Sequence, residues 1–202
     1  MSATIRRYRD SDWAAVYEVC VETADSGRGV RGRYSTDDLV PDTVAGPYLF
    51  LEPGHAYVLD NGERAVGYVI GTASTPDFVA AYQQRWLPRL QVRYRPPSGP
   101  PVTEEEHRLE VMFHPERWLL PELAPHPAHL HINLLAEYRR SGHGRELIST
   151  FLASVAAAGA ASCYLGVRPE NLNARRFYAR LGWHPVQVHG AEPGTYLVHP
   201  TG

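Results

Sequence analysis

One strand–helix–strand unit in the second half of the chain most constrains its fold. The apolar run His129–Leu135 predicts a strand, and Gly144–Ala158 carries apolar residues at helical spacing. A second apolar run, Cys163–Val167, follows that helix and predicts another strand. A helix that joins two strands of one sheet crosses over right-handed and leaves them parallel. We therefore expect one parallel pair of strands at the centre of the sheet.

The remaining segments predict further strands and helices around this unit. A strand at Thr4–Tyr8 opens the chain, and Ser35 is placed to cap a helix after the first one. Two β-rich runs flank Asn61-Gly62, the pair that a type I′ hairpin turn prefers. A helix at Asn171–Leu181 and two closing strands complete the order. This order predicts an α+β fold.

The length of 202 residues predicts a single domain over residues 1–202. Residues 76–127 break the pattern of regular elements, and nine of the 17 prolines lie between Pro88 and Pro127. This segment lacks the apolar periodicity that a core of its own would need. We expect an insertion of short helices and proline-rich loops within the domain.

Charge and composition exclude several classes of function. The net charge of −2 offers no broad positive field for nucleic acid, and no apolar stretch is long enough to span a membrane. The first residues show no secretory signal. Cys20 and Cys163 both fall in apolar patterns, which predicts buried free thiols. We expect a cytoplasmic protein.

The turn between the central strand and its helix has the residues of an anion site. Backbone N–H groups at a helix start lack partners, and the helix dipole is positive there. Gly142 and Gly144 allow an anion to approach the backbone, and Arg139, Arg140 and Arg145 add positive charge. These residues favour a pyrophosphate cradle. The alternative is a glycine-containing turn with solvated arginines.

Two motifs resemble those of the GNAT superfamily of N-acetyltransferases. Arg139–Gly144 matches its R/Q-x-x-G-x-G/A loop, and Val167–Trp183 resembles its next segment, with Trp183 in place of the usual phenylalanine. More loosely, Tyr17–Gly29 and Val66–Val79 resemble the acetyltransferase-like domain of eukaryotic O-GlcNAc hydrolases. The resemblance implies a mixed, mostly antiparallel central sheet with a parallel βαβ cofactor-binding unit, flanked by helices.

The resemblance also implies acetyl-CoA as the donor and a set of residues that bind it. The central strand would splay from its parallel neighbour and bind the acetyl and pantetheine groups, and the glycine–arginine loop would hold the pyrophosphate. The implied cofactor residues are Leu134, Leu135, Ala136, Arg139, Arg140, Ser141, Gly142, His143, Gly144, Arg145, Asn171, Asn173, Phe177 and Arg180. For Asn171, capping of its own helix is an alternative role that does not exclude the first.

The catalytic groups are predicted on the same elements. Tyr178 matches the family's general acid, and the alternative is a tyrosine packed on a helix. His131 is our candidate general base, with a hydrogen-bonded core histidine, Glu110 or a chain of waters as alternatives. No cysteine stands where a nucleophile would be expected, so direct transfer in a ternary complex is favoured.

The acceptor side is predicted at the loop after the first helix and at the insertion. Asp25, Tyr34 and Trp118 are the candidate acceptor residues, and the composition of these segments does not decide the acceptor beyond an unknown amine. His126–His131 has no cysteine partner, so we expect no metal site. A catalytically inactive binding module, a larger acyl-CoA donor and a homodimer remain open alternatives.

Overall fold

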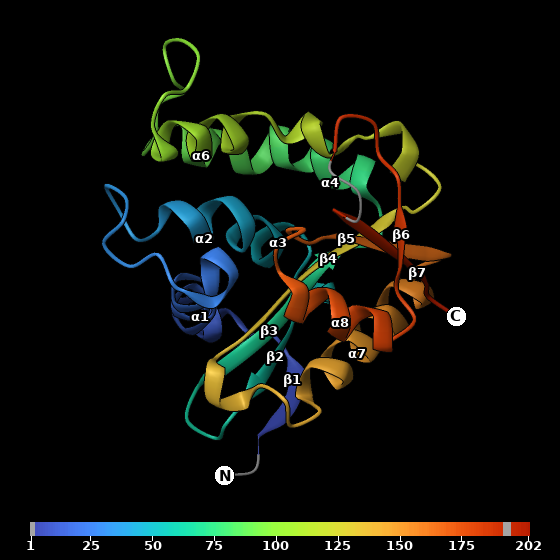
Figure 1. The fold of residues 1–202 in the computed structure, drawn as a ribbon. Coiled ribbons are helices and arrows are strands. Elements are labelled where there is room, and N and C mark those ends of the chain that lie inside the picture. The colour runs from blue at the N-terminus through green and yellow to red at the C-terminus, as the bar shows by residue number, and fades with distance from the viewer. Residues whose placement is uncertain (1–2, 192–194) are drawn as a thin grey trace.

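The computed structural model describes residues 3–191 and 195–202 (Figure 1). Within them the chain forms one seven-stranded sheet with the strand order β1-β2-β3-β4-β5-β7-β6. The strands are β1 (Thr4–Arg7), β2 (Tyr57–Asp60), β3 (Ala65–Thr72), β4 (Ala128–Leu134), β5 (Ser162–Gly166), β6 (His184–Val186) and β7 (Tyr196–Pro200).

The pairing of these strands confirms the expected fold class. β4 and β5 are parallel, and the other neighbouring pairs among the described strands are antiparallel. Helix α7 (His143–Ala157) joins β4 to β5 and lies within one residue of the predicted helix. The sheet is therefore mixed and mostly antiparallel, with the parallel βαβ unit at its centre.

Helices cover both faces of the sheet (Figure 1). Gly71 of β3 marks the face that α7 covers, because an added Cβ there would lie 2.6 Å from Cζ of Phe151. Leu130 pairs with Gly71 and shares this face, so its neighbour His129 points to the other face. There the sheet meets α1 (Trp13–Gly27) and α3 (Gly46–Leu51), and α2 (Leu39–Val44) packs against these two helices.

The segment 76–127 forms short helices above one end of the sheet (Figure 1). Its aromatic side chains Phe78, Tyr82 and Trp86 are buried in the same hydrophobic cluster as the central strands. The helical pieces in and beside this segment are α4 (Thr75–Ala81), a π-helical turn (Tyr82–Trp86), α5 (Leu87–Leu90), α6 (Glu104–Phe113) and two 3-10 turns (Pro115–Trp118 and Pro121–Leu123). The other elements are α8 (Leu172–Arg180) and 3-10 turns at Asp10–Asp12, Pro53–His55 and Ala136–Tyr138.

Two local predictions from the sequence are wrong. Ser35 does not cap a helix, because its hydroxyl donates to Oε1 of Glu105 in α6 at 2.5 Å and α2 begins only at Leu39, with Asp38 at the N-cap position. The hairpin turn is longer than two residues, since β2 ends at Asp60 and β3 begins at Ala65. The Asn61 side chain accepts two backbone N–H groups and stabilises this longer turn.

Cys20 and Cys163 are buried free thiols, as predicted. None of the described helices is long and apolar enough to cross a membrane. Nor do the described residues include a group of three or more His, Cys, Asp or Glu side chains placed to hold a metal ion.

Candidate active site

The two parallel strands separate after a short contact. β4 and β5 pair only at Ala128–Cys163 and His129–Tyr164, although β4 continues to Leu134. Leu135 donates its backbone N–H to Val66 of β3. Because backbone groups alternate in direction along a strand, the N–H and C=O of Leu134 point away from β3 into the opening. The strand opening thus presents a peptide group to a ligand that enters between the strands.

The loop after β4 begins helix α7 in the way the sequence predicts. Gly142 adopts a left-handed φ of 93° as the N-cap, a conformation that glycine adopts without strain. An added Cβ on Gly142 would meet no atom within 4 Å. Among described residues, none accepts a backbone N–H from Arg140, Ser141, Gly142, His143 or Gly144. These groups are free to bind an anion at the positive end of the helix.

Gly144 packs closely against α8. A Cβ at this position would lie 3.2 Å from Cζ of Phe177 and 3.9 Å from Cδ1 of Leu134. The predicted cofactor residues of the loop, of α8 and of β4 therefore meet at Gly144. Asn171 caps α8 by accepting the N–H of Ala174 at 3.1 Å, which is the alternative role predicted for it.

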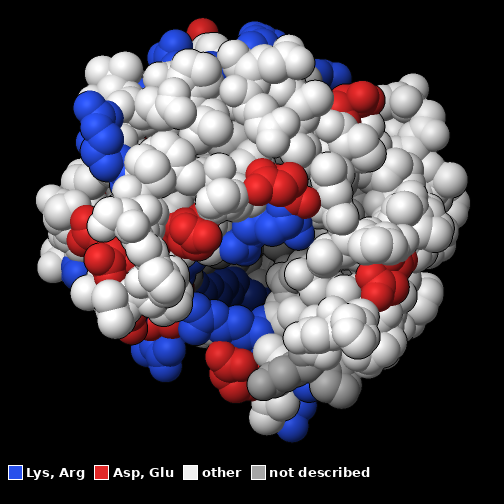
Figure 2. Space-filling model, turned by 90° about the horizontal axis from the view of Figure 1, so that it is seen from above, with Lys and Arg blue, Asp and Glu red and all other residues white. Residues whose placement is uncertain are grey.

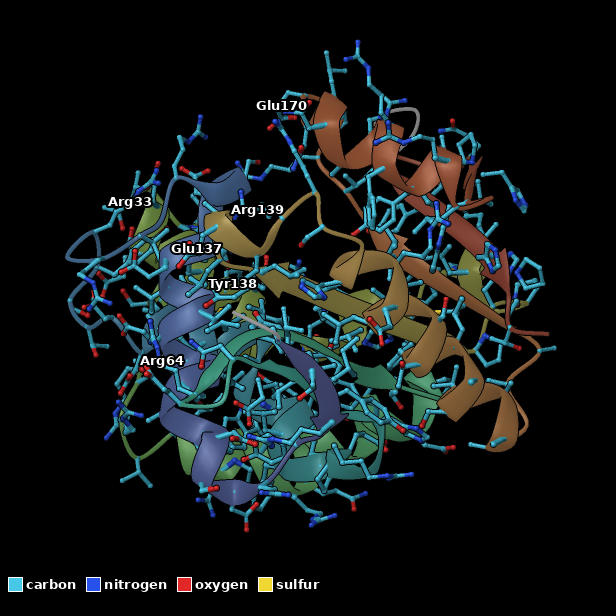
Figure 3. The ribbon with its side chains drawn as sticks, turned by 90° about the horizontal axis from the view of Figure 1, so that it is seen from below. Arg33, Arg64, Glu137, Tyr138, Arg139 and Glu170 are labelled. Carbon is cyan, nitrogen blue, oxygen red and sulfur yellow. The ribbon has the colours of Figure 1, made fainter. Side chains whose placement is uncertain are left out.

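Arg139 lies at the end of β4 (Figure 3). Its Nε donates to the carbonyl oxygen of Leu134 at 2.9 Å. The same guanidinium approaches the end of α1, since a Cβ on Gly27 would lie 3.0 Å from its Nη1. Arg139 therefore ties the loop to the strand opening. Arg139, Arg140 and Arg145 are all exposed.

Asn171 and Asn173 also line a cavity of about 390 Å³ between the start of α8 and the loop after α1. The other lining residues are Ser26, Arg28, Glu170, Leu172 and Arg176. Arg180 is exposed in the last turn of α8. A larger cavity of about 750 Å³, beside Trp13 and Trp86, contains none of the predicted site residues.

Tyr178 is nearly buried on α8, with 9% of its surface exposed. Its ring packs against Phe177 and Trp183. Its hydroxyl has no hydrogen-bond partner among the residues that the structure describes. Burial raises the pKa of Tyr178 above its ordinary value, so the phenol holds its proton at neutral pH.

His131 belongs to a chain of hydrogen bonds that fixes its tautomer. The Thr75 hydroxyl donates to the carbonyl of Pro127 at 2.9 Å, so its oxygen accepts Nδ1–H of His129 at 2.8 Å. Nε2 of His129 is then bare and accepts the Tyr48 hydroxyl proton at 2.7 Å. The Tyr48 oxygen in turn accepts Nε2–H of His131 at 3.1 Å. Nδ1 of His131 is left with a free lone pair.

Burial keeps both imidazoles of this chain neutral. It lowers the pKa of His131 to about 4, and the pKa of His129 falls well below its ordinary value for the same reason, with a smaller effect from His131. Sequence reasoning missed Tyr48 and Thr75, which come from other elements. Tyr48 belongs to no motif, and Thr75 lies in the Val66–Val79 segment without a role assigned to it. A shared strand face for His129 and His131 was the one signal the sequence offered.

The predicted acceptor residues occupy different environments. Asp25, with a left-handed φ of 54°, pairs with Arg28 at 2.9 Å, Arg33 at 2.8 Å and Arg168 at 3.0 Å. Its carboxylate therefore already forms ion pairs with three arginine side chains. Trp118 packs on His129 with ring centroids 6.0 Å apart, on the face that carries His131. Tyr34 packs at the edge of the main hydrophobic cluster.

The chain matches the family model described as Acetyltransferase (GNAT) family over residues 13–183. It is 30% identical over 181 residues to Protein O-GlcNAcase of Rattus norvegicus, covering 89% of this chain and 20% of that protein. The chain thus spans about a fifth of the length of the curated relatives it matches. These matches confirm both resemblances that were drawn from the sequence motifs.

Solved structures agree with this family match. The crystal structure of SsHAT is similar to the whole chain, with a TM-score of 0.94 and 44% identity over 100% of both chains. A GNAT superfamily phosphinothricin acetyltransferase from Sinorhizobium meliloti, solved in complex with AcCoA, gives a TM-score of 0.58 at 15% identity. That likeness covers 99% of this chain and 89% of the other, and it is a likeness of fold.

Proposed function

Because the chain belongs to the GNAT family of acetyltransferases, we propose that it moves an acetyl group directly from acetyl-CoA to an amine. The opening between β4 and β5 carries this proposal, because it lies next to the free N–H groups at the start of α7. One ligand with an anionic end and a thioester end fits such a pair of neighbouring features.

The chain's own residues would hold the donor at both ends. The N–H groups from Arg140 to Gly144 would bind the pyrophosphate, and Leu134 would direct its backbone N–H at the acetyl carbonyl. Arg139 must release the Leu134 carbonyl if the pantetheine binds that oxygen. Ala136 and Leu135 would line the path between these two ends, and Phe177 would flank it from α8.

Tyr178 is the proposed general acid. A thiolate leaves when the acetyl group moves, and it needs a proton. The raised pKa of Tyr178 keeps that proton on the phenol until the basic thiolate forms beside it. A phenol without a described partner is free to donate.

His131 is the proposed general base. Its free Nδ1 can accept the proton that the amine loses on attack, directly or through water. Because burial lowers the pKa of His131, solvent does not protonate Nδ1 at neutral pH, and this nitrogen stays available to accept the amine's proton. The Tyr48–His129–Thr75 chain holds the imidazole in the required tautomer.

The cysteines favour direct transfer over an acetyl-enzyme. Burial raises the pKa of Cys20 to about 11, and it raises the pKa of Cys163 as well. Neither thiol forms the thiolate that would attack a thioester at neutral pH. The amine must therefore attack the donor itself.

The alternative function is a binding module that keeps the fold without catalysis. Arg139 favours it, because its bond to Leu134 occupies the strand opening that a donor would use. The two functions are separated by incubating the protein with acetyl-CoA and a panel of amines, and by detecting released CoA and acetylated amine by mass spectrometry. We expect acetylated product, initial rates that depend on both substrates in a sequential pattern, and no acetylated protein without amine. Absence of turnover with every amine would favour the binding module.

A further inference from the structure

Asn133 shares a face of β4 with His131. The side chains of a strand alternate between its two faces, so residues two apart point the same way. The amide of Asn133 is held by Tyr68 of β3, because Nδ2 donates to the tyrosine hydroxyl oxygen at 2.8 Å. Tyr68 is fully buried and is the register partner of Asn133, so it fixes the amide in one orientation.

Each of these two β4 side chains keeps one free hydrogen-bond acceptor. Nδ2 is the bound atom of Asn133, so Oδ1 remains, and no described residue donates to it. Nδ1 of His131 has a free lone pair, because Nε2–H is the group that Tyr48 accepts. The described side-chain atoms that are sealed from solvent without a partner are the Tyr8 hydroxyl and Nε1 of Trp183. The two acceptors are not among them, so both are open to a ligand.

These acceptors stand beside the peptide that would hold the acetyl group. Leu134 follows Asn133 directly, and its N–H points into the opening between β4 and β5. An acetyl group on that N–H is one residue from Asn133 and three residues from His131 along the strand. An amine that approaches it over this face of the sheet therefore meets both free acceptors.

The attacking nitrogen needs such acceptors, and arginine has none to offer. Figure 2 shows a hollow in the surface seen from above, with Lys and Arg side chains, drawn in blue, in its wall. The sequence contains no lysine, so this positive colour is arginine. A guanidinium only donates hydrogen bonds, whereas a neutral primary amine donates its two N–H groups and keeps its lone pair for the attack. Orientation of the nitrogen therefore falls to groups like the two acceptors of β4.

We propose that Asn133 is a further catalytic residue, whose Oδ1 binds the N–H that the amine keeps while Nδ1 of His131 takes the proton that it loses. The proposal rests on the proposed function. With both N–H groups bound, the nitrogen lone pair is directed at the thioester carbon. A secondary amine has one N–H, which His131 must take, so Oδ1 of Asn133 is left against an alkyl group without a hydrogen bond.

The transfer then balances in atoms and electrons. The nitrogen lone pair forms the new C–N bond, and the C–S bond breaks with its electron pair on sulfur. One amine proton passes to Nδ1 of His131, and Tyr178 gives a proton to the thiolate. The other amine hydrogen stays on the nitrogen, because the neutral amide of Asn133 accepts a hydrogen bond but is too weak a base to take a proton. Solvent then carries the proton from His131 back to Tyr178.

The test compares primary amines with their N-methyl derivatives. The pairs are glycinamide with sarcosinamide, benzylamine with N-methylbenzylamine, and glucosamine with N-methylglucosamine, each at saturating acetyl-CoA. For wild type we expect kcat/KM to be at least tenfold higher for the primary member of every pair that is turned over. This ratio reports on the second N–H, which a residue with a purely structural role would not sense.

Substitutions at Asn133 and Tyr68 assign the ratio to the amide oxygen. Asn133→Leu removes the acceptor, so the ratio should fall below threefold, through slower reaction of the primary amines. Asn133→Asp keeps an oxygen at the position of Oδ1 and should keep a ratio of at least tenfold. Tyr68→Phe frees the amide to rotate and should lower the ratio at least threefold. Tyr17→Phe, which also removes a buried hydroxyl, is the matched control and should keep the wild-type ratio.

The outcomes separate this proposal from the proposed function. Equal kcat/KM for both members of each pair in wild type would overturn the proposal, and so would an unchanged ratio in Asn133→Leu. If Asn133→Leu binds no acetyl-CoA in calorimetry, the ratio in Tyr68→Phe decides, and a value equal to that of Tyr17→Phe would overturn it. No turnover of any amine by wild type would instead overturn the proposed function, and this proposal with it.

Discussion

The hydroxyl of Tyr48 lies 3.1 Å from Nε2 of His131, and this contact leaves Nδ1 as the basic nitrogen of that imidazole. Tyr48 is fully buried, and its second contact, to His129, gives its proton a fixed direction. A residue of α3 thus orients a residue of β4, although the two are far apart in the sequence.

Tyr48→Phe tests this relation. Without the hydroxyl, His131 can adopt either tautomer, and we expect kcat to fall roughly 10- to 100-fold, up to the lower end of the 10²- to 10⁴-fold that general acid–base catalysis contributes. The stability should fall by about 1–3 kcal/mol, since buried polar partners are left unpaired. Steady-state kinetics and urea unfolding measure both effects. Tyr17→Phe, which removes a buried hydroxyl bonded to Asp42, is the matched control and should leave kcat within about twofold. Equal kcat values for the two variants would contradict the claim that Tyr48 orients His131.

The buried histidines predict how stability depends on pH. The unfolded chain binds protons on His131 below about pH 6.5, whereas the folded protein binds one only near pH 4. Stability is therefore complete above pH 6.5 and falls as the pH drops from there towards 4. The slope is at most about 1.4 kcal/mol per pH unit for each such histidine. His129 adds to the loss in the same direction.

Urea unfolding at several pH values between 7.5 and 5 measures this slope. We expect His131→Asn to be less stable at neutral pH but to show a shallower fall on acidification. Substitution of the exposed His107 by Asn should leave the slope as in wild type. If His131→Asn and His107→Asn lose stability with the same slope, His131 is not buried in its neutral form.

Tyr178→Phe should separate catalysis from binding. The variant keeps the ring that packs against Trp183, so we expect the fold and the Kd for acetyl-CoA to be unchanged. Loss of the general acid should lower kcat by roughly 10²- to 10⁴-fold. In wild type the rate should not fall as the pH rises towards 10, because the pKa of Tyr178 lies above its ordinary value. A variant with full kcat would show that another group protonates the thiolate.

Gly144 and Phe177 should behave as a coupled pair. Gly144→Ala places a Cβ 3.2 Å from Cζ of Phe177, so the Phe177 ring must move by a few tenths of an ångström and acetyl-CoA binding should weaken at least threefold. Phe177→Leu shortens the opposing side chain and should restore much of that loss in the double variant. Calorimetric titrations of wild type, the two single variants and the double variant give a double-mutant cycle for acetyl-CoA binding. Strictly additive losses would show that the two residues do not meet in the working protein.

The βαβ unit was predictable because its signals are local. Helical spacing and two glycines place α7 within one residue of its observed bounds, and Tyr178 lies on the helix predicted for it. The cap predicted at Ser35 was wrong, because the hydroxyl of Ser35 donates to Glu105 of the inserted segment. Tyr48 was not predictable for a similar reason, since its role depends on how α3 packs against β4.

The most direct test of the account is calorimetric titration of acetyl-CoA into wild type, Gly142→Asp and Gly62→Asp. Both glycines have left-handed φ values and no neighbour within 4 Å of an added Cβ, so the two substitutions carry similar backbone strain. Only Gly142 stands at the proposed pyrophosphate cradle, where a carboxylate would repel the ligand. We predict micromolar binding to wild type and Gly62→Asp, and a loss of at least tenfold, about 1.4 kcal/mol, in Gly142→Asp. Equal binding by all three proteins, or no binding to wild type, would contradict the assignment of the donor site.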